Sequence, residues 1–172
     1  MRGKAGVNTK KIVVLSLFVS AAMILSYIES LLPAFLPLPG VKIGLANIVT
    51  LAVMFSFGVP EALLVSLLRV ALTSLLFGSP VSLFYSLLGS LLSIAVMAAL
   101  SKVPCFSIIG VSIGGGVFHN LGQIIAASVV IGGTEVFVYL PLLAVSGVAA
   151  GAAVGVVCAV LLNRLLPLIS LN

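Results

Sequence analysis

Long apolar runs, separated by short breaks that contain proline or glycine, dominate the chain. Within each run Val, Leu, Ala and Ile stay dense instead of alternating with polar residues, which favours helices over the strands of a membrane barrel. Helices that are apolar all round are buried in lipid or among neighbouring helices. The pattern predicts six helices, at residues 12–32, 43–57, 60–77, 81–100, 108–131 and about 136–166.

The lengths of these runs match the thickness of a bilayer, because about 20 apolar residues are needed to cross one as a helix. The second run is short unless Val59 belongs to it. The first run follows a basic start, as in a signal peptide, but it continues for about two turns past the small residues of a cleavage site. We therefore expect this helix to be retained. The sequence predicts an all-α integral membrane protein with one six-helix domain over residues 1–172, a basic tail at residues 1–11 and an outer loop at residues 33–42.

Composition excludes a water-soluble domain. Of the 172 residues, 62% are hydrophobic and 6% are charged, whereas soluble domains average about 45–50% and about 25%. The chain has no Asp, one His and two Cys far apart, so we expect no zinc or iron–sulfur site and no cofactor. It also lacks a P-loop motif and an Asp-rich motif for Mg²⁺–diphosphate. We therefore predict binding or passage of a small molecule rather than catalysis.

Lys and Arg set the expected orientation, because the cytoplasmic segments of membrane proteins carry an excess of them. With the amino terminus inside, the cytoplasmic side carries six of these residues and the outside carries Lys42 alone. Both termini are therefore expected in the cytoplasm, in a multi-pass protein of the cell membrane. No basic stripe with interleaved aromatic residues occurs, so we expect contact with anionic lipid and not with nucleic acid.

Arg69 is the charged residue expected deepest in the membrane. It follows Pro60 by nine residues, which places it about 13 Å along a helix and near the middle of a core about 30 Å thick. An arginine at that depth costs about 2.5–3.5 kcal/mol on insertion scales and by default indicates a functional site. The alternative is a structural role, in which the side chain reaches the membrane surface or bonds to backbone carbonyls.

Three hydrogen-bonding residues, His119, Asn120 and Gln123, lie together in the fifth run, just after a glycine triplet at residues 114–116. Residues three and four apart adjoin on a helix, so we expect the three side chains to point into one sector. Two interpretations stay open. The side chains either bind a ligand or form hydrogen bonds between helices. Each interhelical hydrogen bond stabilises the protein by about 0.6 kcal/mol.

The first outer loop is apolar and contains several prolines, which is unusual for a solvated connector. We interpret it either as a lid over an outward pocket or as an interfacial loop. Glu29 and Lys42 lie near its two ends and are expected to pair. Asn47 is expected to face the pocket mouth or another helix, and Tyr85, in the fourth run, is expected to reach the pocket.

Small residues spaced four apart predict close helix packing, because they let backbones approach. The sixth run contains Gly147, Gly151 and Gly155 in this spacing, and the fifth contains Gly110 and Gly114.

Two motifs carry a resemblance to a known family. These are Pro-Gly-Val-Lys-Ile-Gly-Leu-Ala-Asn-Ile at residues 39–48, and His-Asn-Leu-Gly-Gln at residues 119–123, followed by Tyr-Leu-Pro at residues 139–141. In these motifs the chain, over about residues 10–165, resembles the bacterial membrane family labelled heptaprenyl diphosphate synthase component I or Gx transporter. Six short spans with a long first outer loop also resemble the S subunits of energy-coupling-factor vitamin transporters.

These resemblances imply an S-component-like bundle with an outward pocket capped by the first loop. In S subunits the pocket binds a vitamin or related metabolite, and a separate membrane subunit with two ATPases supplies the energy. We therefore favour a substrate-binding subunit for uptake of a small anionic metabolite. Arg69 would bind the anionic group, Lys42 would guard the entrance, and His119, Asn120 and Gln123 would orient the ligand.

Two alternatives stay open. The first is a membrane accessory subunit of polyprenyl diphosphate or quinone synthesis, with a soluble prenyl synthase as its partner. The second is a scaffold of a membrane redox complex, with a flavin- or quinone-bearing partner.

Overall fold

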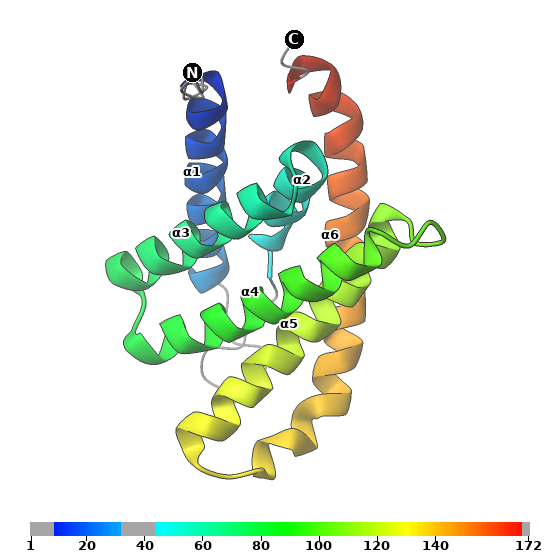
Figure 1. Cartoon of the computed structure of the whole chain (residues 1–172). Helices are drawn as coiled ribbons and strands as arrows, with labels where there is room; N and C mark the ends of the chain where they lie inside the picture. The colour runs from blue at the N-terminus through cyan, green and yellow to red at the C-terminus, as the bar shows by residue number, and fades with distance from the viewer. Residues whose placement is uncertain (1–8, 32–43, 170–172) are drawn as a thin grey trace, which may run out of the picture.

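The computed structural model describes residues 9–31 and 44–169, and side chains up to residue 164. Within these ranges the chain forms helices and short turns, and no strand (Figure 1). The prediction of an all-α membrane bundle is confirmed. The elements are α1 (Thr9–Leu31), α2 (Asn47–Phe57), α3 (Val59–Phe77), α4 (Pro80–Leu100), α5 (Ile108–Ile131), the 3₁₀ helix η1 (Glu135–Tyr139) and α6 (Leu140–Ile169).

Five of the described helices are long and apolar enough to cross a membrane, namely α1, α3, α4, α5 and α6. Such helices characterise a multi-pass membrane protein. Helix α2 differs from the expected second span, because its 11 residues extend over about 16 Å, roughly half of a hydrocarbon core. The first turn of α1 and the last turn of α6 lie at the same end of the bundle in Figure 1.

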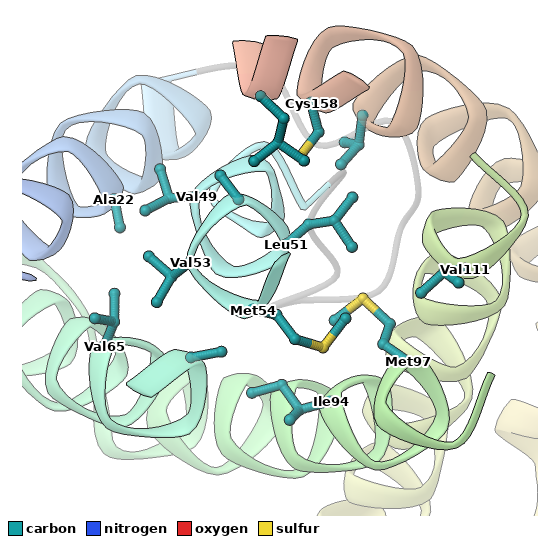
Figure 2. Close-up of a cluster of buried hydrophobic side chains, with 14 of the residues drawn as sticks. Ala22, Val49, Leu51, Val53, Met54, Val65, Ile94, Met97, Val111 and Cys158 are labelled. Atoms are coloured by element: carbon teal, nitrogen blue, oxygen red, sulfur yellow. The ribbon is translucent and has the colours of Figure 1, made fainter. Parts of the chain in front are cut away.

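The short helix α2 occupies the centre of the bundle. Its residues Val49 to Met54 are all buried, with exposed fractions of 6% or less. Figure 2 shows Leu51 and Val53 of α2 with side chains from the surrounding helices, such as Val111 of α5 and Cys158 of α6, around them. A helix that is apolar on every side is stable where protein surrounds it, so α2 need not cross the bilayer by itself.

Local sequence explains where the helices end. Gly58 between α2 and α3 has a φ of 113°, a backbone conformation that residues other than glycine rarely adopt. Pro60 follows within the first turn of α3. The hydroxyls of Ser79 and Ser107 cap α4 and α5 by accepting bonds from the backbone N–H groups of Ser82 and Gly110, as serine does at helix starts.

An ion pair joins two of these helix starts. Lys11 Nζ of α1 lies 2.5 Å from Glu61 Oε1 of α3. The pair places the starts of α1 and α3 at the same end of the molecule.

Glycines let α5 approach both of its neighbours. A Cβ on Gly151 or Gly155 of α6 would lie 2.7 or 2.8 Å from backbone atoms of α5, and a Cβ on Gly122 of α5 would lie 2.7 Å from the carbonyl oxygen of Leu88 on α4. The predicted close packing of α6 through its glycines is therefore confirmed. The same prediction is wrong for Gly110, whose nearest neighbour is the side chain of Phe106 just before α5.

Candidate functional site

Arg69 lies in the seam between α3 and α1. Its side chain is 5% exposed, and its Nη1 group donates a hydrogen bond of 3.3 Å to Ser26 Oγ on α1. Glu29 follows Ser26 by one turn, is 6% exposed, and its carboxylate attracts the guanidinium. The interior around Arg69 is therefore polar, although the seam lies within a membrane bundle.

The other edge of the Arg69 guanidinium contacts no acceptor in the part of the chain that the structure describes. Nε and Nη2 are buried and have no hydrogen-bond partner among the described residues. These two N–H groups point the same way and form the fork that binds a carboxylate or phosphate through two parallel bonds. The hydroxyl of Ser66, one turn earlier on α3, is also buried and, within the described ranges, unpartnered. This arrangement offers donors to an oxyanion.

Gly44 connects Glu29 to the start of α2. Its backbone N–H donates a hydrogen bond to Glu29 Oε1, and its φ of 89° is one that glycine adopts readily. The side chain of Asn47 lies directly beside Gly44, with Nδ2 2.9 Å from the position of a Cβ there. Of the residues predicted from the sequence, Glu29 thus lies beside Arg69, and Gly44 connects Glu29 to Asn47.

A small cavity adjoins the start of α2. It has room for about one water-sized group, with a volume of about 10 Å³. Ser93, which the sequence reasoning missed, contributes a buried hydroxyl to it. The available signal was the spacing of Ser86, Ser90 and Ser93, which puts three hydroxyls along α4. The lining residues are Gly44, Asn47, Ser93, Met97, Ser112, Gly115, Gly116, Ala150, Gly151 and Val154.

His119 and Gln123 lie in a neighbouring seam, between α5 and α4. Both are buried, with exposed fractions of 5% and 0%. A Cβ on Gly89 of α4 would lie 3.1 Å from His119 Cε1 and 3.1 Å from Gln123 Cγ, so both side chains pack directly against α4. Neither residue lines the cavity at the start of α2, although His119 follows the lining residue Gly115 by one helical turn.

Asn120 points to a different helix. Its Nδ2 donates hydrogen bonds to Leu143 O at 2.8 Å and to Ser146 Oγ at 3.2 Å, both on α6. The expectation that three polar side chains share one sector is therefore wrong. Consecutive residues are about 100° apart around a helix, and α5 is packed between α4 and α6, so His119 and Asn120 face different neighbours.

Two predicted site residues remain. Tyr85 is buried, with an exposed fraction of 3%, in an apolar cluster with residues such as Ile124 and Leu143. Lys42 and the rest of the loop at residues 33–42 lie outside the described residues, so the lid and the expected pairing of Lys42 with Glu29 stay predictions. Within residues 9–31 and 44–169, no three His, Cys or acidic residues come together in a group that could hold a metal ion.

Comparison with known proteins gives the family. A family model described as heptaprenyl diphosphate synthase component I matches residues 18–161. Because the match covers most of the chain, the protein belongs to this family, and the resemblance in its sequence motifs is confirmed. No curated protein and no solved structure matches the chain.

Proposed function

We propose that this protein is a substrate-binding membrane subunit that takes up a small anionic metabolite and holds its carboxylate or phosphate on Arg69. The observation that carries the proposal is the Nε and Nη2 edge of this buried side chain, which has no hydrogen-bond partner among the described residues. A buried charged group that lacks hydrogen bonds is costly. Glu29 already attracts the guanidinium, and an oxyanion would supply the two missing hydrogen bonds. The assigned role is binding, with no chemical step on this chain.

The surrounding residues support a ligand site rather than a purely structural arginine. A structural arginine uses its N–H groups on carbonyls or carboxylates of the protein, whereas within residues 9–31 and 44–169 Arg69 directs only Nη1 to an acceptor, Ser26. Glu29 lies close enough to orient the guanidinium and is itself fixed by Gly44. Asn47 and the nearby cavity extend the polar region away from Arg69.

The other polar residues predicted from the sequence would contact the ligand less directly than Arg69, or not at all. His119 and Gln123 would reach the ligand along the seam between α4 and α5, whereas Tyr85 packs in an apolar cluster with Ile124 and Leu143. Lys42, two residues before Gly44 in the sequence, would attract the anion at the entrance. Asn120 instead fixes α5 to α6. In this proposal the protein lies in the cell membrane with both termini in the cytoplasm, and a separate energising subunit with ATPases drives uptake.

Mass spectrometry of small molecules retained by the gently purified protein tests the proposal directly. The variants are Arg69→Lys, which keeps the charge but loses the fork, and Arg69→Gln, which loses both. Arg164→Gln is the matched control, because Arg164 is exposed near the end of α6. We expect a retained carboxylate or phosphate whose affinity falls about 10- to 100-fold in both Arg69 variants and stays unchanged in the control. Equal retention by all the variants would refute the proposal.

The family match favours a second candidate function, as the membrane component of a polyprenyl diphosphate synthase. The Asp-rich chemistry would then belong to a soluble partner, since this chain has no Asp, and Arg69 would hold the diphosphate group of the prenyl product. Deletion of this chain would lower the synthase activity of membranes or change the product length. If both are unaltered while metabolite uptake is lost, the first function holds and the second is excluded.

A further inference from the structure

The cavity at the start of α2 contains a hydroxyl group that the protein leaves unused. Ser93 is 1% exposed, and its Oγ has no hydrogen-bond partner within residues 9–31 and 44–169. Ser90 on the same helix is equally buried, at 2%, yet its hydroxyl donates to the carbonyl oxygen of Leu87 at 3.1 Å. The hydroxyl of Ser90 is therefore satisfied by its own helix. The hydroxyl of Ser93, in contrast, makes no such bond and is available to an occupant of the cavity.

The same cavity receives the amino-terminal end of α2. This helix has 11 residues and begins at Asn47 after Ala46, whose methyl side chain cannot cap it. The first N–H groups of a helix carry partial positive charge. The N–H groups of residues 47–49 donate to the carbonyl oxygens of residues 44–46, so the start of α2 contributes the positive end of its dipole. The hydrogen bond to an acceptor in the cavity comes from the hydroxyl of Ser93.

The lining of the cavity restricts its occupant to an uncharged group. None of the described residues around it carries a charge, and its volume of about 10 Å³ holds one water-sized group. The backbones of Gly115 and Gly151 form part of the wall, and a Cβ on Gly115 would lie 3.2 Å from Ser93 Oγ. A single carbonyl or hydroxyl oxygen meets these limits of size and charge.

We propose that the cavity at the start of α2 binds an uncharged carbonyl or hydroxyl oxygen of the ligand whose anionic group binds Arg69. This inference rests on the proposed anion site. The two places are connected within the structure, because Gly44 lines the cavity and also donates to Glu29, the carboxylate beside Arg69. The substrate class is then a small oxyanion that also carries a keto, amide or hydroxyl oxygen.

Titration calorimetry on the full purified chain with matched probe pairs tests this inference. Lactate and pyruvate are compared with propionate, levulinate with pentanoate, and glycerol phosphate with propyl phosphate, so that each pair differs in its uncharged oxygens. We expect the wild type to bind the oxygenated member of at least one pair more tightly. Ser93→Ala is expected to reduce this preference about three- to tenfold, the effect of one hydrogen bond, and Ser90→Ala to leave it unchanged.

A second variant keeps the test independent of hydroxyl loss. Ser93→Thr retains the hydroxyl but adds a methyl group to a cavity that has room for one small group, so it also is expected to remove the preference. If the oxygenated and plain probes bind equally to the wild type, or if Ser93→Ala and Ser90→Ala behave alike, the inference is overturned and the anion site stands. If no probe binds, or if binding is insensitive to Arg69→Lys, the anion site and this inference fail together.

Discussion

Replacing Gly122 with alanine tests how closely α5 packs against α4. A Cβ at this position would lie 2.7 Å from Leu88 O and 2.8 Å from the Cα of Gly89. Both are backbone atoms, so no side chain can rotate away and the two helices must separate. Overpacking of this kind costs about 1–3 kcal/mol.

The matched control is Gly110→Ala, on the same helix. There the added methyl group would lie 3.1 Å from Cδ1 of Phe106, an exposed side chain that can shift. Alanine is favoured over glycine within a helix by about 1 kcal/mol, and this gain applies to both variants. We therefore expect Gly122→Ala to be less stable than Gly110→Ala by about 1–3 kcal/mol, the overpacking cost alone.

Reversible unfolding in mixed micelles, followed by circular dichroism, measures this difference. Both variants should retain the helical content of the wild type before unfolding. A Gly122→Ala protein as stable as Gly110→Ala would mean that α4 and α5 are too far apart for a Cβ at residue 122 to contact the α4 backbone. In that case His119 and Gln123 would not pack directly against α4.

Three further outcomes are expected from the same unfolding measurement. Asn120→Ala loses two hydrogen bonds to α6 and should lower the free energy of unfolding by about 1 kcal/mol, given about 0.6 kcal/mol for each interhelical bond; no loss would mean that α6 is held by packing alone. Leu51→Ala, at a fully buried position in α2, should cost about 2–5 kcal/mol, and a cost below that range would place α2 outside the core. A double-mutant cycle of Lys11→Gln and Glu61→Gln should give a coupling of at most about 1 kcal/mol that decreases with added salt, because the Lys11 side chain is 39% exposed; a larger, salt-independent coupling would indicate a buried pair.

The helices could be predicted from the sequence because their breaks carry strong local signals. Gly58 with Pro60 and Gly78 with Pro80 end one helix and start the next, and the observed bounds lie within a few residues of the expected ones. The length of α2 could not be predicted in this way. Its apolar composition suits lipid and a protein interior equally, and only the packing of the other helices around it shows which applies.

The site was predicted in part. The depth of Arg69 in a single helix identifies it as unusual, but its partners Ser26 and Glu29 come from α1, and nothing local in the sequence pairs the two helices. Helical spacing puts His119 near Asn120 without showing that neighbouring helices contact α5 on both sides. The ion pair of Glu61 with Lys11 depends likewise on tertiary packing.

The central position of α2 has a consequence for biosynthesis. The ribosome completes α2 before it starts α3 and long before α6, and α2 packs against both. An 11-residue segment is too short to be anchored across the bilayer during translation, so its native environment does not exist until the last helix has been inserted. Maturation of this protein therefore ends with the enclosure of a segment made near the beginning, and the cavity at the start of that segment, which residues of α6 help to line, is completed in the same step.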